Sequence, residues 1–312
     1  MISYELLKRL NFETDDIEYI LDCEKKYGDI IHPFSSEFML TNGKQDFKPY
    51  EIKQSEEKYN FAAKTLEKVS SSVPDCDNEY VLQLLFWLHC LPFAKKYYDE
   101  NGISEEIFYD TMKDISVKTR ECKEQHGKTG TFTVWFFLYF DYLYFALGRL
   151  QFYTEMYNHK PYKFSDYEIN PGDRVYSCHI PSGERLTTEM CMDSFGRAYE
   201  FYKDEIEGDI LPLICRSWLI YPNYIGRVFP EGSNMEKFAK LFDITETIET
   251  GRKFGDCARV FGVPFEGTTE GFPSDNTLRR NFIEYINSGG EFGGGIGIIL
   301  YDGVKKEIIN QK

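Results

Sequence analysis

His179 is the residue of this sequence best suited by type and position to proton transfer. It lies near the end of a strand predicted over residues 174–180, just before the bend "IPSGERLTT" at residues 180–188. An imidazole titrates near neutrality and can accept a proton from an ammonium or hydroxyl group. The alternative is a structural histidine satisfied by local hydrogen bonds. We therefore take His179 as a candidate general base and keep the structural alternative open.

The bend after His179 joins this strand to a helix predicted from Thr188 to about Lys203. Backbone N–H groups at the start of a helix attract anions, so the bend could bind a phosphate with Arg185 beside it. The alternative is an ordinary corner with Thr187 as the helix N-cap. Glu189 would compete with a bound anion. The candidate ligand-binding residues are Ile180, Ser182, Gly183, Arg185, Thr187 and Thr188.

The cysteines are predicted to be reduced and buried. The chain has eight, none in a C-x-x-C pair, and its five histidines are scattered, so no metal motif is visible. Cys178 must point to the opposite face of its strand from His179, which argues against a Cys-His catalytic pair. Cys178 and Cys215, on strands predicted to be adjacent, are expected to be small buried residues.

Composition limits the classes of partner. The 312 residues carry a formal net charge of -15, which disfavours nucleic acid. The most apolar stretch, residues 133–148, is too short to span a bilayer and contains Asp141. The N-terminus lacks the basic and apolar regions of a signal peptide. We expect a cytoplasmic protein without a membrane span. Its 26 Phe, 23 Tyr and 3 Trp indicate core packing or an aromatic-lined pocket.

The elements that position these residues fall into two predicted domains, 1–130 and 131–312. The first reads as helices, with Thr14, Ser55, Asp77 and Ser104 before apolar helical patterns. Residues 32–54 look irregular, and Pro92 should end or kink a helix. A long apolar helix is expected over 131–147.

From residue 148 the pattern mixes strands with helices. The capping box at Ser233 predicts a helix, and Asp275 can cap another that stops at Gly289-Gly290. Glycines 289–297 are interpreted as a helix stop and flexible bend, because they do not follow a strand as in a dinucleotide-binding loop. The predicted strands are 149–157, 162–168, 174–180, 212–221, 244–249, 257–263 and 295–302.

This order of elements resembles the GNAT acyltransferase fold, and more closely a bacterial family of acyltransferase-domain proteins with a helical N-terminal domain and a GNAT-like C-terminal domain. The resemblance covers most of the C-terminal half. The residues that carry it are "ALGRLQF" at 146–152, "HIPSGERLTTEMCMDSFGRAYEF" at 179–201, "CRSWLIYP" at 215–222, "SNMEKFAKLF" at 233–242 and "TLRRNFIEYINSGG" at 277–290. The fold class it implies is α+β: a helical N-terminal domain followed by a GNAT-like mixed α/β domain.

The resemblance implies an acyltransferase that uses a thioester of CoA or acyl-carrier protein, needs no metal, and acylates a small-molecule amine or hydroxyl. The donor would lie between the strands at His179 and Cys215. Two positions depart from the family pattern. The usual Q/R-x-x-G-x-G/A bend has one glycine here, and Phe238 stands where a tyrosine acid is expected, so Tyr221 or Tyr224 would have to replace it. The alternatives are a catalytically inactive GNAT-like binding or regulatory module and, less well supported, a carbohydrate-active protein.

Overall fold

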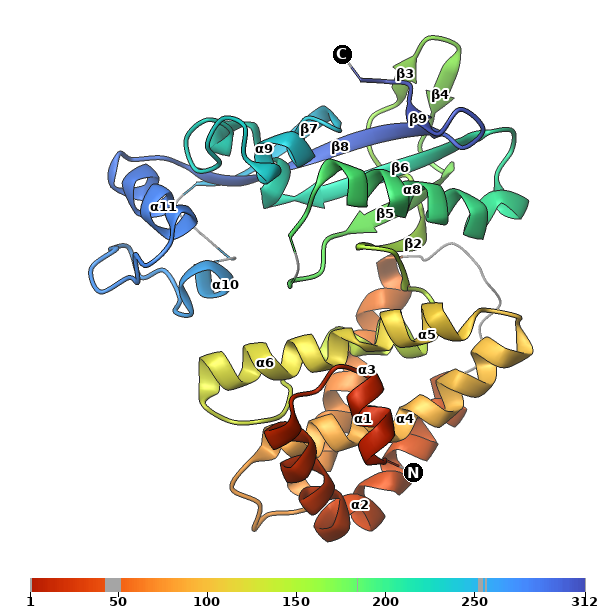
Figure 1. The fold of residues 1–312 in the computed structure, drawn as a ribbon, viewed down its shortest axis with the longest axis vertical. Coiled ribbons are helices and arrows are strands. Elements are labelled where there is room, and N and C mark those ends of the chain that lie inside the picture. Colours follow the sequence, from red (N-terminus) through yellow and green to blue (C-terminus); the bar gives the residue numbers. More distant parts are fainter. Residues whose placement is uncertain (1, 43–51, 184, 252–254, 256, 312) are drawn as a thin grey trace. The chain divides into compact units, whose positions relative to one another are not determined.

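The protein divides into two compact units in a computed structural model that describes residues 2–42, 52–183, 185–251, 255 and 257–311 (Figure 1). The first unit comprises Met1–Leu147, Gln151–Glu155 and Pro181–Gly183. The second comprises Gly148–Leu150, Met156–Ile180 and Glu184–Lys312.

The first unit is helical, as predicted from capping residues and apolar spacing. The helices α2 and α3 pack on α4, whose side chains are buried nearly all round because apolar residues occupy every face. The helices are α1 (Tyr4–Arg9), α2 (Thr14–Asn42), α3 (Ile52–Ser71), α4 (Glu79–Glu100), α5 (Glu105–Met112) and α6 (Asp114–His126).

Aromatic rings form the core of this unit around Trp87 of α4. The indole stacks on Phe140 at a centroid distance of 5.3 Å and meets Phe38 and Phe136 edge-on. All four side chains are at most 1% exposed. Much of the aromatic content of the first unit is therefore core packing.

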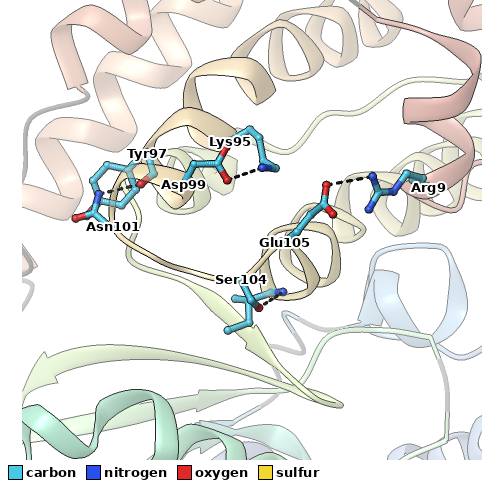
Figure 2. Close-up of polar contacts among 8 residues, drawn as sticks. Arg9, Lys95, Tyr97, Asp99, Asn101, Ser104 and Glu105 are labelled. Carbon is cyan, nitrogen blue, oxygen red and sulfur yellow. Dashed lines mark hydrogen bonds and ion pairs between the residues drawn. The ribbon is translucent and has the colours of Figure 1, made fainter.

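The connection from α4 to α5 shows how local polar contacts fix the helix ends (Figure 2). The Asn101 side chain donates to the Tyr97 carbonyl at 2.8 Å, closing α4. The Ser104 hydroxyl accepts the Ile107 N–H at 3.3 Å, so the predicted cap at Ser104 is confirmed. Glu105, in the first turn of α5, pairs with Arg9 of α1 at 3.2 Å. Both partners of this pair are half-exposed, so its contribution to stability is small.

Several expected helix limits were wrong. Residues 32–42 continue α2 through Pro33, and α3 begins at Ile52, so the expected irregular stretch falls largely in helices; residues 43–51 lie outside the described residues. The N-cap of α4 is Asn78 instead of Asp77, and the helix runs through Pro92 to Glu100.

Packing explains why α4 continues past Pro92. Leu91 and Ala94, next to the proline, and Tyr98 further along the helix are at most 2% exposed. Burial of this face offsets the backbone hydrogen bond that proline removes.

The helix expected over 131–147 is also wrong. This stretch forms η1 (Val134–Phe136), α7 (Phe137–Phe140) and the strand β1 (Phe145–Leu147). The chain turns at Asp141, which is followed by Tyr142 at a φ of 58°. The buried Asp141 carboxylate accepts a hydrogen bond from Lys58 Nζ at 2.7 Å. The Lys58 ammonium compensates the buried negative charge of Asp141. The apolar periodicity of residues 131–147 gave no sign of this pairing.

The second unit is built on a sheet whose strands follow the order β5-β6-β8-β7, with β9 beside β8. β5 and β6 are parallel, and the other pairs are antiparallel. The strands are β5 (Arg174–His179), β6 (Ile210–Ser217), β7 (Asp243–Gly251), β8 (Phe292–Asp302) and β9 (Glu307–Ile308). The strand β2 (Leu150–Met156), which neighbours β1, precedes them in the chain.

Different elements cover the two faces of this sheet. The helix α8 (Thr188–Tyr202) runs along one face, with Phe195 against Tyr301 (Figure 1). The hairpin of β3 (Tyr162–Phe164) and β4 (Tyr167–Ile169) packs on the other face, where its side chains join a buried cluster with Ile214 and Ile296. Each strand therefore presents alternate residues to two different environments.

Most predicted elements of this unit are confirmed, including the strands over 149–157, 174–180 and 244–249 and the helix from Thr188. The predicted strand over 162–168 is the β3–β4 hairpin. The strand predicted over 212–221 ends at Ser217 and continues as η3 (Trp218–Ile220) and η4 (Pro222–Tyr224). The turn η2 (Lys203–Glu205) follows α8.

The remaining helices give one confirmation and two corrections. Ser233 caps α9 (Asn234–Ala239) by accepting the Glu236 N–H at 3.2 Å, as predicted. Asn276, not Asp275, caps α11 (Thr277–Asn287). Residues 257–263 were expected to form a strand, but they contain α10 (Cys257–Phe261), in which three side chains spaced three and four apart enter one buried cluster.

The glycine run after α11 lies mostly in β8, so its interpretation as a flexible bend is wrong. A Cβ on Gly293 would stand 2.6 Å from the Ile248 carbonyl oxygen, and one on Gly295 would stand 2.4 Å from that of Ile220. The glycines are needed because other backbone segments pack directly on this strand.

Candidate active site

The open end of the parallel pair β5–β6 is the centre of the candidate site. The pairing joins Tyr176 to Leu213 and Ser177 to Ile214. Both strands continue past it, to His179 and to Ser217. The C-terminal ends of two adjacent parallel strands, a common location for ligands, therefore lie at this edge of the sheet.

The sheet face beneath α8 carries the buried Cys178 and Cys215, and α8 itself contributes the buried Cys191. Burial raises the pKa of Cys178 well above its ordinary value, and it raises those of Cys191 and Cys215 to about 12. These thiols are protonated at neutral pH and unsuited to nucleophilic attack. The prediction that Cys178 and Cys215 are buried residues is confirmed.

His179 belongs to the opposite face, and its side chain is half-buried. Because side chains alternate along a strand, His179 shares a face with Val175 and Ser177. Val175 belongs to the buried cluster on that face. Arg216 also belongs to this face, since it follows Ile214 of the same cluster. His179 and Arg216 each stand two residues beyond the pair Ser177–Ile214, at the same level of neighbouring strands.

A polar row continues from Arg216 across the sheet. Arg216 of β6 and Glu246 of β7 both stand opposite Ile296 of the central β8. His159 connects them: its Nε2 lies 3.5 Å from Arg216 Nη1, and its Nδ1 lies 3.4 Å from Glu246 Oε1. His159 Nε2 accepts the hydrogen bond from Arg216, because a guanidinium only donates. The contact with Glu246 is an approach without a hydrogen bond, since Glu246 Oε1 has no hydrogen-bond partner among the described residues.

Sequence reasoning missed His159, Arg216 and Glu246. They come from a loop and two strands far apart in the chain, and only strand register brings them together. The one local signal was the place of Arg216 in "CRSWLIYP", directly after Cys215.

The bend residues predicted to bind a ligand are divided between the two units. Pro181–Gly183 belong to the first unit, whereas Ile180, Arg185, Thr187 and Thr188 belong to the second. Glu184 lies outside the described residues. Arg185 is exposed, and Gly183 adopts a φ of 122° with open space where a Cβ would point. Glycine at 183 is therefore required by backbone conformation rather than by crowding.

The N-terminus of α8 is capped by its own side chains. The Thr187 hydroxyl accepts the Met190 N–H at 3.3 Å, which confirms Thr187 as the N-cap. The pKa of Glu189 is lowered by hydrogen bonds from its own backbone N–H and from the Thr187 hydroxyl. A phosphate at this terminus would have to share it with the Glu189 carboxylate.

Tyr221 is buried in the aromatic cluster behind β6 and β8, with Tyr224 and Phe292. Its hydroxyl accepts a hydrogen bond from Asn223 Nδ2 at 2.8 Å, and its ring lies against Gly293. Burial raises the pKa of Tyr221, and the carboxylates of Glu249 and Glu291 raise it further. The phenol is therefore protonated at neutral pH and is a weaker acid than an exposed tyrosine. The Tyr224 hydroxyl accepts the Gly293 N–H at 3.4 Å.

The described residues contain no group of three or more His, Cys, Asp and Glu side chains placed to hold a metal ion. Within the same residues, no helix combines the length and the apolar character needed to cross a bilayer. All eight cysteines are unpaired, and seven of them are buried.

Two family profiles match consecutive parts of the chain. The N-acyltransferase N-terminal domain matches residues 1–141, and the GNAT-like C-terminal domain matches residues 144–299. The helical region followed by a mixed α/β domain is the fold class expected from the sequence, which is confirmed. No curated protein sequence matches the chain.

Solved structures of similar fold are described as acyltransferases. One, in complex with decanoyl-CoA and teicoplanin, is 17% identical over 95% of this chain and 86% of that chain, with a TM-score of 0.65. Another, in complex with decanoyl-CoA, is 18% identical over 94% of this chain and 86% of that chain, with a TM-score of 0.67. A mutant in complex with octanoyl-CoA is 17% identical over 95% and 86%, with a TM-score of 0.67. At such identities the likeness shows the fold.

Proposed function

The chain belongs to the family of N-acyltransferases with a GNAT-like C-terminal domain, and from this membership we propose that it transfers an acyl group from a thioester to an amine or hydroxyl acceptor. The solved acyltransferases crystallised with octanoyl-CoA and decanoyl-CoA support an acyl-CoA donor, with acyl-carrier protein as the other carrier considered. The complex that also contains teicoplanin supports a separate small-molecule acceptor. Unpaired cysteines suit a reducing compartment, and we propose the cytoplasm.

The observation that carries the proposal is the open end of β5–β6, with a half-buried imidazole beside it. Both strands continue past their last registered pair, so their ends present side chains at the sheet edge. His179 and Arg216 stand there on the same face, whereas Cys178 and Cys215 face α8. This arrangement supports His179 rather than a thiol as the group that handles protons.

The proposed reaction needs one proton acceptor and one proton donor. The acceptor nitrogen or oxygen forms a bond to the thioester carbonyl carbon, and the carbon–sulfur bond breaks. His179 takes the proton that the acceptor loses. The sulfur leaves as a thiolate and gains a proton, for which Tyr221 is the proposed source because its phenol is protonated at neutral pH. Positioning of donor and acceptor supplies much of the rate.

The bend is the proposed binding segment for the phosphates of the donor. Its members are Ile180, Ser182, Gly183, Arg185, Thr187 and Thr188. The exposed Arg185 guanidinium is the strongest single reason, because it is a permanent cation beside the start of a 15-residue helix. The capping by Thr187 and Glu189 weakens the N-terminus of α8 as an anion site, so Arg185 has the larger role.

A thermal-shift titration with CoA, octanoyl-CoA and decanoyl-CoA tests the donor part of the proposal. A ligand at a hundred times its Kd stabilises the folded state by about 2.7 kcal/mol, which raises the Tm by several degrees. Mass spectrometry of candidate amines and alcohols incubated with the protein and the donor tests transfer. Stabilisation without any acylated product would favour a binding module that lacks the chemistry. Absence of stabilisation by all three ligands would contradict a CoA donor.

A further inference from the structure

An arginine stands beside His179 at the open end of β5–β6. His179 and Arg216 each lie two residues beyond the registered pair Ser177–Ile214, on the same face of adjacent strands. Both belong to the second unit. Neighbouring strands are about 4.8 Å apart, so the two side chains start from nearby points of the backbone. Arg216 is exposed, so a ligand whose reacting group lies at His179 can also reach the guanidinium.

His159 holds the Arg216 side chain along this face of the sheet. Arg216 Nη1 lies 3.5 Å from His159 Nε2 and donates to it. A guanidinium carries five N–H groups in a planar fork, and this contact involves one nitrogen of that fork. Glu246 approaches the far side of the imidazole, with its Oε1 3.4 Å from Nδ1. The imidazole therefore stands between the guanidinium and this carboxylate.

The cation of Arg216 is on the other face of the sheet from the segment proposed to bind the phosphates of the donor. That segment, with Arg185, leads directly into α8, which covers the face of Cys178 and Cys215. Arg216 follows Cys215, so its side chain points to the opposite face. Two cations on two faces fit two anionic groups, the phosphates of the donor and a second anion on the acceptor.

The setting of Arg216 favours a carboxylate as this second anion. A carboxylate presents two oxygens that match the guanidinium fork and accept two hydrogen bonds from it. A phosphate monoester carries nearly two negative charges at neutral pH, which one guanidinium near Glu246 does not balance. The formal net charge of -15 repels anions in general, so an anionic acceptor requires a local cation. The complementary acceptor is an amine that carries a carboxylate.

We propose that the acceptor is an amino acid whose amine lies at His179 and whose carboxylate is bound by Arg216. This acceptor class rests on the proposed acyl transfer. The amine nitrogen bonds to the thioester carbonyl carbon, the carbon–sulfur bond breaks, and His179 takes the proton that the amine loses. The carboxylate forms and breaks no bond. Arg216 therefore determines specificity, and the product is an N-acyl amino acid.

Acylation assays with phenylalanine and 2-phenylethylamine, which differ only in the carboxylate, test the proposal with octanoyl-CoA as the donor. At equal concentrations of free amine base, wild type should acylate phenylalanine with a kcat/KM higher by about tenfold or more, the usual value of a hydrogen-bonded charge pair. Arg216→Met should abolish this preference by raising the KM for phenylalanine, and should keep kcat/KM for 2-phenylethylamine within about threefold. Faster acylation of O-phosphoethanolamine than of β-alanine would overturn the choice of a carboxylate.

The matched control removes a cation elsewhere on the same sheet. Lys305 is exposed and pairs with Asp302, six residues along β8 from Ile296, which stands opposite Arg216. Lys305→Met should keep the preference for phenylalanine within about twofold of wild type. An equal loss of preference in Lys305→Met and Arg216→Met would show general surface attraction and overturn the proposal.

Binding of the products separates the carboxylate site from the proposed function, because it requires no turnover. In calorimetry, N-octanoylphenylalanine should bind wild type about tenfold or more tightly than N-octanoyl-2-phenylethylamine, and Arg216→Met should bind the two alike. If neither amine is acylated and this difference in binding is found, acyl transfer is wrong and the carboxylate site stands. Equal binding of the two products by wild type would overturn the carboxylate site. If Arg216→Met does not fold, the two wild-type comparisons still decide the question.

Discussion

The two faces of the sheet in the second unit treat titratable side chains in opposite ways. Under α8, burial holds Cys178, Cys191 and Cys215 as neutral thiols with raised pKa values. On the other face, His159 lies between Arg216 and Glu246, and His179 stands at the level of Arg216. Consecutive residues such as Cys178 and His179 therefore have different surroundings, because successive side chains of a strand point to opposite faces of the sheet. We therefore propose that proton transfer takes place on the face that carries His179.

The largest expected effect comes from removing the imidazole. His179→Gln should lower turnover by about a hundredfold or more, the usual value of general-base assistance. Glutamine does not titrate, so the acid limb of the pH–rate profile should flatten. Cys178→Ala is the matched control, one residue away on the other face, and should keep turnover within about threefold. A His179→Gln variant as active as wild type would remove His179 from the mechanism.

In the first unit, burial raises the pKa of a carboxyl group, that of Asp141, as it raises the pKa values of the buried thiols. Burial raises the pKa of Asp141 from 3.8 to about 6, against the opposing attraction of Lys58. The folded chain therefore binds this proton more tightly than the unfolded chain. The resulting stability is fully present below about pH 4 and is lost as the pH rises through about 6, by roughly 3 kcal/mol.

Comparison with Asp141→Asn isolates this effect from other titrating groups. The unfolding free energy of wild type should fall relative to that of the variant between pH 4 and pH 7, as measured by denaturant titration. The ion pair with Lys58 forms only when Asp141 is ionised, so its effect is already contained in the folded-state pKa of about 6. A difference between the two proteins that does not vary with pH would contradict the raised pKa.

An intermediate effect is expected on the cysteine face. Cys215→Ser places a hydroxyl among buried groups beneath α8, which should cost about 1–3 kcal/mol of stability. Turnover at a temperature where the variant is folded should stay within about threefold. A loss of activity as large as that of His179→Gln, with stability unchanged, would contradict the assignment of catalysis to the face that carries His179.

The smallest effects are expected at the bend over residues 180–188. They distinguish a bend that only caps α8 from one that also binds the donor. Thr187→Ala removes the α8 cap and should cost about 1 kcal/mol of stability. Arg185→Ala should leave the Tm unchanged because the side chain is exposed, yet weaken CoA binding several-fold. Calorimetry and thermal melts measure both quantities. Unchanged CoA affinity in Arg185→Ala would contradict the proposal that the bend binds the donor and would leave it only the structural role of capping α8.

Local signals predicted much of the fold. Ser104, Thr187 and Ser233 were each identified as helix caps, and each accepts the expected backbone hydrogen bond. The strands flanking the site also followed from alternation and turn residues. These features depend on a few consecutive residues, so sequence alone contains them.

Features set by tertiary contacts were missed. The apolar run at 131–147 turns at Asp141 because Lys58, far away in the chain, pairs with that carboxylate. The glycines of β8 were mistaken for a bend because Ile220 and Ile248, which pack on them, are distant in sequence. The row of His159, Arg216 and Glu246 depends on the register of three strands. No local pattern specifies such pairings.

The most direct test of the account is the release of free CoA thiol from decanoyl-CoA by the wild-type protein, followed with a thiol reagent with and without an acceptor. Acyl transfer predicts release that depends on the acceptor, saturates with both substrates and matches the amount of acylated product. Thiol release that is independent of any acceptor, or no release by a protein that binds decanoyl-CoA, would contradict acyl transfer.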